Sequence, residues 1–135
     1  MTKENVLETL RALGFMPEEL EGFGYRFDYD GFKFVYIPDP EEAKCLTLMA
    51  PFIFEITDDN RVAVLEAMVR LSGSIKFVQP HIIIGEQVAL NYQHYVGDGE
   101  LTEELVEHMV RVLAYGIEKF HSIIDGEEEE ENEDD

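Results

Sequence analysis

The spacing of apolar residues along the chain predicts three amphipathic helices. Over residues 3–13 they recur every three or four positions, directly after Thr2, a residue type that caps helices. A second helix is predicted over Asp58–Ser72. A third is predicted from Thr102 to about Ile124, with one apolar face along its whole length.

A turn signal predicts a first hairpin between the first two helices. Asp30-Gly31, a dipeptide favoured in two-residue type I′ turns, separates Tyr25–Tyr29 from Phe32–Ile37. This turn would set Asp28 opposite Lys33 on one face of the hairpin and gather six aromatic residues on the other. The predicted aromatic surface consists of Tyr25, Phe27, Tyr29, Phe32, Phe34 and Tyr36.

A longer stretch, Cys45–Ile56, alternates between two faces, which is the pattern of a half-buried strand. Pro51 lies on the opposite phase and removes one backbone donor, so an edge position or a bulge is expected there. The residues predicted to share the buried face are Leu46, Leu48, Ala50, Phe52, Phe54 and Ile56.

A second hairpin is predicted after the central helix. Gly85-Glu86 fits a two-residue turn with glycine in the first position. The apolar phase of the outgoing strand changes between Phe77 and Ile82, on either side of Pro80. A one-residue bulge near Pro80 would reconcile the two phases.

The central helix, Asp58–Ser72, has a wider apolar surface than one partner would cover. One stripe consists of Val62, Leu65 and Val69, and the other of Val64, Met68 and Leu71. A surface helix normally shows a single apolar stripe of somewhat over 100°. Because the chain's own sheet would cover only one stripe, the sequence predicts that Val64, Met68 and Leu71 form a dimer interface with a second copy.

Together these elements predict an α+β fold with the order helix, three-strand meander, helix, hairpin, helix. The five strands would form one antiparallel sheet with the helices packed on it. Residues 1–126 are expected to form a single domain. Residues 127–135, EEEEENEDD, have nothing to bury and are expected to be a disordered acidic tail.

Charge narrows the classes of partner. The 135-residue chain has 30 acidic residues against 10 Lys and Arg, a net charge of −20. The tail holds eight of the acids, so residues 1–126 keep 22 − 10 = 12 excess negative charges. This disfavours nucleic acid and membrane surfaces, which require clustered Lys and Arg. A single cysteine and an N-terminus without a signal-peptide pattern predict a cytoplasmic protein.

Candidates for chemistry are weak in this sequence. Asp28–Gly31 resembles the start of a calcium loop, but glycine comes too early for an EF-hand. Glu118 and His121 have the spacing found in di-iron helix bundles, which need a second such motif and two further glutamates. Cys45 has no adjacent glycine-rich turn or helix start that would activate a thiol. The sequence therefore predicts no catalytic residue, no metal site and no cofactor.

The order of elements resembles the fold of bacterial type III secretion chaperones and the related YbjN-like proteins. The resemblance covers about residues 3–124. It rests on the meander ending at Ile56, the helix Asn60–Leu71 and the hairpin IKFVQPHIII-GE-QVALNYQHYV. It implies a small acidic cytoplasmic homodimer that binds an extended polypeptide without nucleotide, with the central helix at the dimer interface.

We therefore expect a non-enzymatic protein-interaction module that binds a protein or peptide partner as a homodimer. Two alternatives stay open. The aromatic surface could line a pocket for a small molecule. Alternatively, the acidic surface and tail could mask a basic partner protein.

Overall fold

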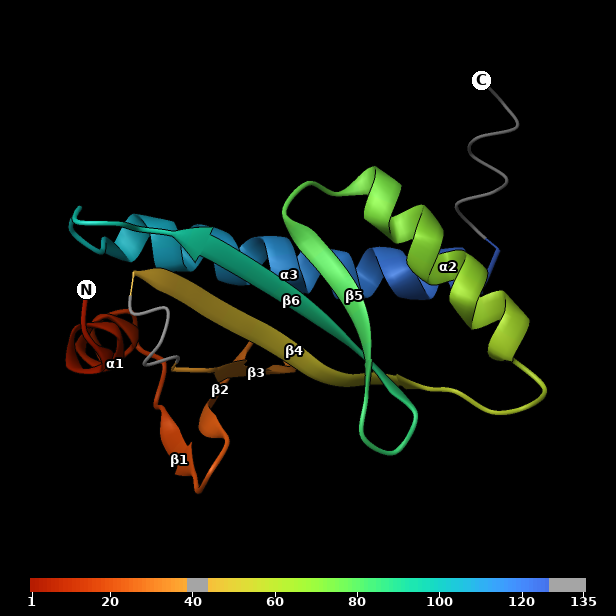
Figure 1. Cartoon of the computed structure of the whole chain (residues 1–135), viewed down its shortest axis with the longest axis horizontal. Coiled ribbons are helices and arrows are strands. Elements are labelled where there is room, and N and C mark those ends of the chain that lie inside the picture. Colours follow the sequence, from red (N-terminus) through yellow and green to blue (C-terminus); the bar gives the residue numbers. More distant parts are fainter. Residues whose placement is uncertain (39–43, 127–135) are drawn as a thin grey trace.

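The computed structural model describes residues 1–38 and 44–126, and the predicted acidic tail lies outside them. The helices are α1 (Lys3–Ala12), α2 (Arg61–Ser74) and α3 (Glu103–Ile124). The strands are β1 (Glu18–Leu20), β2 (Gly24–Tyr29), β3 (Phe32–Tyr36), β4 (Cys45–Glu55), β5 (Val78–Ile83) and β6 (Gln87–Tyr95). Figure 1 shows their arrangement.

One antiparallel sheet joins all the strands in the order β1-β2-β3-β4-β6-β5, which confirms the α+β class. The predicted number of five strands is wrong, because a short segment after Pro17 forms an additional strand. Instead Glu18–Leu20 pairs with β2 as a sixth strand, with Glu19 opposite Tyr25. The connection over residues 21–23 is short enough to fold this segment back onto the free edge of β2.

Helix α3 lies along one face of the sheet and contacts β4, β5 and β6 (Figure 1). Helix α1 packs near the N-terminal end of α3, and α2 packs near the C-terminal half of α3. Gly116 brings α3 close to the sheet, since a Cβ atom there would lie 3.1 Å from Cδ1 of Leu90. The opposite face of the sheet carries no helix among the described residues. We call it the open face.

Both terminal helices start at the predicted caps. Thr2 and Asn5 form a capping box around the start of α1, and the Leu105 amide donates to Oγ1 of Thr102 at 3.1 Å. After α1, the Phe15 amide donates to the Leu10 carbonyl at 2.9 Å. That turn places Phe15 against Phe27, with 5.3 Å between the ring centroids.

The first hairpin has the predicted turn and register. Asp30 and Gly31 both have positive φ angles, 52° and 83°, as a type I′ turn requires. Phe27 lies opposite Phe34, and Asp28 lies opposite Lys33. The register set by this dipeptide is therefore confirmed.

The expected bulge at Pro51 is confirmed, and it changes the assignment of Phe52. Ala50 pairs with Leu90 and Phe54 pairs with Val88, so residues 51–53 lie opposite a single residue of β6. Phe52 has a φ of 53°, and its side chain does not join the buried face as predicted. The physical reason is that the left-handed backbone breaks the two-residue alternation inside the bulge.

Two predictions for the second hairpin are wrong. The β5–β6 register runs without a shift from Val78 opposite Tyr92 to Ile83 opposite Gln87, so there is no bulge at Pro80. The connection is residues 84–86, one residue longer than predicted. The change of phase arises earlier, because Phe77 has a φ of 71° and lies before the strand begins.

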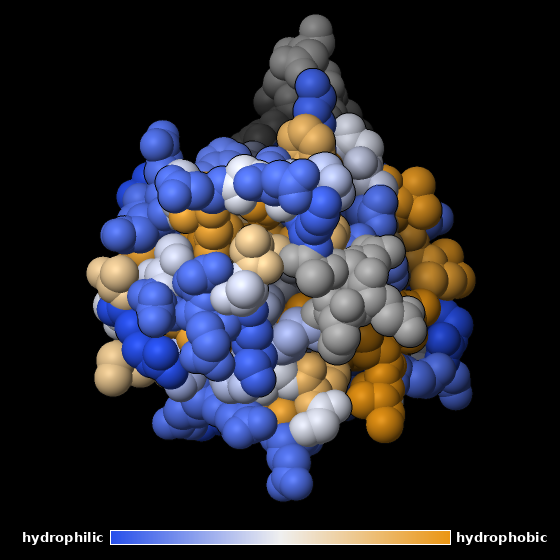
Figure 2. Space-filling model, turned by 60° about the vertical axis from the view of Figure 1, so that its left-hand side comes forward, coloured by the Kyte–Doolittle hydropathy of each residue, from blue (hydrophilic) through white to orange (hydrophobic). Residues whose placement is uncertain are grey.

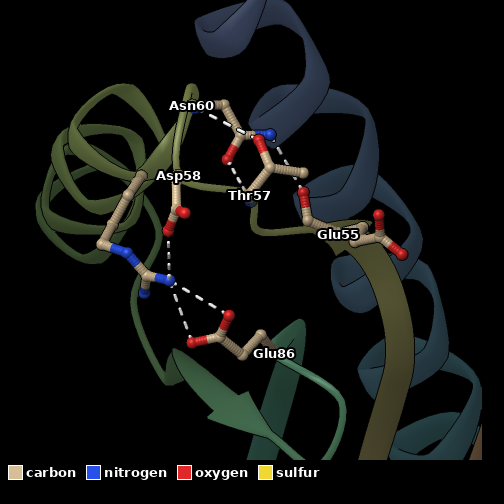
Figure 3. Close-up of polar contacts among 6 residues, drawn as sticks. Glu55, Thr57, Asp58, Asn60 and Glu86 are labelled. Atoms are coloured by element: carbon tan, nitrogen blue, oxygen red, sulfur yellow. Dashed lines mark hydrogen bonds and ion pairs between the residues drawn. The ribbon is translucent and has the colours of Figure 1, made fainter.

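A polar cluster joins β4, α2 and the second hairpin (Figure 3). The Thr57 amide donates to Oδ1 of Asn60 at 2.7 Å, and Nδ2 of Asn60 donates to the Glu55 carbonyl at 3.0 Å. Helix α2 starts after this turn, at Arg61, rather than at the predicted Asp58. The Arg61 guanidinium donates to both carboxylate oxygens of Glu86 at 3.0 Å and so ties the helix start to the hairpin turn.

Candidate interaction surfaces

An apolar groove of about 780 Å³ lies on the open face of the sheet. Its lining residues are Leu20, Phe23, Arg26, Lys33, Phe34, Val35, Met49, Pro51, Phe52, Ile83 and Ile84. We call it the open-face groove. The face that points to the viewer in Figure 1 turns to the right in Figure 2, where hydrophobic side chains gather beside a largely hydrophilic surface.

The rim of the groove is built by irregular parts of the chain. Phe23 follows β1 and is 47% exposed, Phe52 lies in the β4 bulge and is 58% exposed, and Ile84 in the hairpin turn is 84% exposed. The floor is regular, since Val35 and Met49 are opposite each other in the β3–β4 ladder and both are buried. Exposed apolar side chains therefore surround an apolar floor.

Polar side chains continue the open face beyond Met49. Asn91 lies opposite Met49 in the β4–β6 ladder, and Gln79 lies opposite Asn91 in the β5–β6 ladder. Oδ1 of Asn91 is buried and has no hydrogen-bond partner among the described residues. A buried acceptor without a partner is costly, and its burial also keeps this oxygen out of reach of a molecule bound on the face.

The charged residues that line the groove are both basic, although the chain is strongly acidic. The Arg26 guanidinium forms an ion pair with Glu18 at 2.9 Å, across the β1–β2 ladder. Lys33 is exposed and lies opposite Asp28. Each base therefore has an acid close by, and the groove is apolar rather than strongly charged.

The two edges of the sheet are poor templates for an added strand. On one side, β1 has three residues, and its Glu18 and Glu19 are both exposed. On the other side, β5 carries Pro80, which has no N–H to donate. Short length, charge and proline are the features that protect sheet edges in native proteins. The open face is thus more available for binding than the edges.

The predicted aromatic surface is not a surface. Phe27, Phe34 and Tyr36 are buried, and Tyr25, Tyr29 and Phe32 pack against the same core. Burial and the neighbouring Tyr25 raise the pKa of Tyr36 to about 12. The aromatic face therefore serves to hold the sheet against the helices.

The dimer interface predicted on α2 is also corrected. Val64 and Leu71 are completely buried in the chain's own core, and Met68 packs against that core. The exposed stripe is the other one, Val62, Leu65 and Val69, which we call the outer stripe of α2. Val62 and Val69 are 70% and 73% exposed.

A signal in the sequence favours this orientation. At 100° per residue, Glu66 is about 40° round the helix from Val62 but about 160° from Val64. A charged residue next to Val62 indicates solvent on that side. On the other side, Ala67 next to Leu71 allows a close approach to the core, and both are buried.

The residues considered for chemistry do not come together. Among residues 1–38 and 44–126, no three His, Cys, Asp or Glu side chains are grouped to hold a metal ion. His121 instead lies 3.0 Å from the Ile53 carbonyl through its Nε2 atom, with Phe54 and Phe120 beside the ring. Over the described residues, 1–38 and 44–126, no helix is long and apolar enough to span a membrane.

Comparison with known proteins finds similar solved structures. No family model matches the chain, and no curated protein matches it. An uncharacterised protein from Methanothermobacter thermautotrophicus has a similar structure, with a TM-score of 0.65 at 13% identity. The alignment covers 93% of this chain and 98% of that one.

Two further neighbours have described roles. YbjN from E. coli, a proposed transcription regulator, gives a TM-score of 0.64 at 14% identity over 90% of this chain and 87% of that one. A chain of the HopA1–SchA chaperone–effector complex gives 0.60 at 12% identity over 89% and 97%. The resemblance to secretion chaperones and YbjN-like proteins is therefore confirmed for the fold.

Proposed function

We propose that this protein is a non-enzymatic interaction module that binds an extended polypeptide segment on the open face of its sheet. The observation that carries the proposal is the open-face groove, bordered by the exposed side chains of Phe23, Phe52 and Ile84. Folded chains rarely leave a contiguous apolar surface of this kind unless another molecule covers it.

A polypeptide would suit both the apolar groove and the polar continuation of the open face beyond Met49. Apolar side chains of a bound segment would fill the groove over Val35 and Met49. Its main chain would lie beside the polar residues Asn91 and Gln79, which continue the same face. The similarity to a chain of a chaperone–effector complex supports a polypeptide as the partner.

A small molecule is a weaker candidate for the groove. Specific small-molecule sites combine an apolar wall with several convergent polar groups. Here the charged lining residues are Arg26 and Lys33, and Arg26 is already paired with Glu18. The aromatic face that the sequence suggested for a small molecule is filled by the core.

Photo-crosslinking tests the proposal in cells. A photoreactive phenylalanine analogue placed at Phe52 should capture a polypeptide, because that side chain lies on the rim of the groove. The matched control is the same analogue at Tyr115, an exposed aromatic residue on α3. Mass spectrometry of the adducts identifies the captured segment.

The expected result is a defined adduct from position 52 that is missing from position 115. The captured segment should contain large apolar residues, since these would fill the groove. The same adducts at both positions, or none at position 52, would contradict the proposal.

We further propose that the protein forms a homodimer through the outer stripe of α2. Leaving Val62, Leu65 and Val69 in water forgoes about 1.5–3 kcal/mol for each side chain that a partner would fully bury. Glu66 and Arg70 line a shallow hollow together with Leu65 and Val69. A two-fold axis brings the same patch of both copies together, so this stripe would pack against the same stripe of a second copy.

Light scattering after gel filtration tests the dimer. The wild-type chain should elute as a dimer, and Val69→Asp should elute as a folded monomer, since this side chain makes no contribution to the core. Leu71→Asp should unfold the chain rather than separate two copies. A wild-type monomer at micromolar concentration, or a dimeric Val69→Asp variant, would contradict the proposal.

An acidic regulator that masks a basic partner is the remaining alternative. It is distinguished by deleting residues 127–135 from the full chain. Binding through the open-face groove predicts unchanged capture at position 52. Loss of capture on deletion would favour the acidic segment as the binding element.

A further inference from the structure

We infer that His121 is a positioning residue for the open-face groove, although it lies on the helix side of the sheet. It fixes the β4 bulge from behind, and the bulge holds Phe52 on the opposite side as part of the groove rim. The inference rests on the proposed function, because it gives His121 a role in presenting that binding surface.

The pairing of β4 with β6 is interrupted at the bulge. Residues 51–53 lie opposite the single residue Ala89, so the ladder hydrogen bonds of a regular strand are interrupted there. Pro51 has no N–H to donate. A backbone carbonyl that turns away from the ladder must find another donor if it is buried.

His121 supplies that donor. Its Nε2 atom lies 3.0 Å from the Ile53 carbonyl oxygen, in a partly buried position. A carbonyl oxygen can only accept, so Nε2 carries the proton and donates it in this hydrogen bond. The ring is held in place by Phe54 and Phe120, each with its centroid 6.1 Å away.

Phe52, the residue before Ile53, lines the groove. Phe52 has a φ of 53°, a conformation that a bulky L-residue adopts only when its surroundings impose it. Its side chain is largely exposed, so packing of the ring in the core does not hold this conformation. The contact between His121 and the next residue, Ile53, is the anchor on the far side of the sheet.

Substitutions at His121 distinguish the effect of losing the N–H donor from the effect of losing the aromatic ring. His121→Phe keeps an aromatic ring but removes the N–H, whereas His121→Gln can still donate through its amide. His108→Phe is the control for loss of a histidine, since His108 is exposed on the same helix. The position of Phe52 is followed by the ¹⁹F resonance of 4-fluorophenylalanine placed at residue 52 of the full chain.

We expect His121→Phe to shift and broaden the ¹⁹F resonance at position 52, and His121→Gln and His108→Phe to leave it unchanged. A second label at Phe23, which lines the same groove from the β1–β2 connection, should not respond. Crosslinking at position 52 should fall at least five-fold in His121→Phe and recover in His121→Gln.

Three results would overturn the inference. The first is an unchanged ¹⁹F resonance in folded His121→Phe. The second is an equal change in the Gln and Phe variants, and the third is an equal response of the labels at Phe52 and Phe23. The ¹⁹F readout needs no partner, so failure of crosslinking in the wild-type chain would reject the proposed function and leave the role of His121 to be decided by the resonance.

Discussion

The two faces of the sheet differ in the regularity of the backbone that forms them. The face under the helices is regular, with Leu46, Leu48 and Ala50 joining the core at every second position of β4. The open face owes its groove to irregular features, including a bulge, a hairpin turn and the connection after β1. Regular alternation therefore builds the core of this protein, whereas departures from it build the proposed binding surface.

The strongest test of this contrast compares two phenylalanines, one for each face. Phe27→Ala should lower the free energy of unfolding by about 3–5 kcal/mol, because it removes an almost completely buried ring from the core. Phe52→Ala should change it by no more than about 1 kcal/mol, because the ring is mostly in solvent. Urea denaturation measures both values, and similar losses would break the contrast.

The pH dependence of the free energy of unfolding tests how well the core shields the Tyr36 hydroxyl from water. The pKa of Tyr36 is about 12 in the folded chain, against an ordinary value of 10.0, so folding favours the neutral phenol. This contribution is complete below pH 10 and is lost as the pH rises toward 12, at about 1.4 kcal/mol per pH unit.

The matched variant is Tyr36→Phe, which lacks the ionising group. Its free energy of unfolding should fall less steeply than that of the wild type between pH 10 and pH 11. Urea denaturation at each pH gives the two slopes. Parallel slopes would show that the Tyr36 hydroxyl is not shielded from water by the core.

A smaller effect is expected from the backbone of the bulge. Phe52→Gly should leave the free energy of unfolding unchanged or raise it by up to about 1 kcal/mol, since glycine adopts a positive φ without a steric cost. Phe54→Gly, two residues along in the regular strand, is the control and should destabilise the chain. A loss of stability in Phe52→Gly comparable to that in Phe54→Gly would indicate that the Phe52 ring contributes to the core.

Local signals in the sequence were sufficient for most of the fold. Asp30-Gly31 predicted a turn and thereby a register, and Thr2 and Thr102 predicted helix starts, because each of these residues acts on its own neighbours. Glu18–Leu20 has no such signal. It becomes a strand only because β2 offers a free edge beside it, which is a tertiary effect.

The candidate site was harder to predict for a related reason. Pro51 indicated a bulge, but the size of the bulge and the turn of Phe52 to the open face depend on pairing with β6 and on His121. The two stripes of α2 are similarly apolar, so hydrophobicity alone does not choose between them. The position of Glu66 beside Val62 was the available signal for the exposed stripe.

Measurement of affinity tests whether the open-face groove binds a polypeptide. The segment captured at position 52 is titrated by calorimetry against the wild type, Phe52→Ser and, as a control, Tyr115→Ser. We predict that Phe52→Ser raises the dissociation constant at least ten-fold, which corresponds to about 1.4 kcal/mol, and that Tyr115→Ser leaves it unchanged. An unchanged dissociation constant in Phe52→Ser would contradict binding of the segment in the groove.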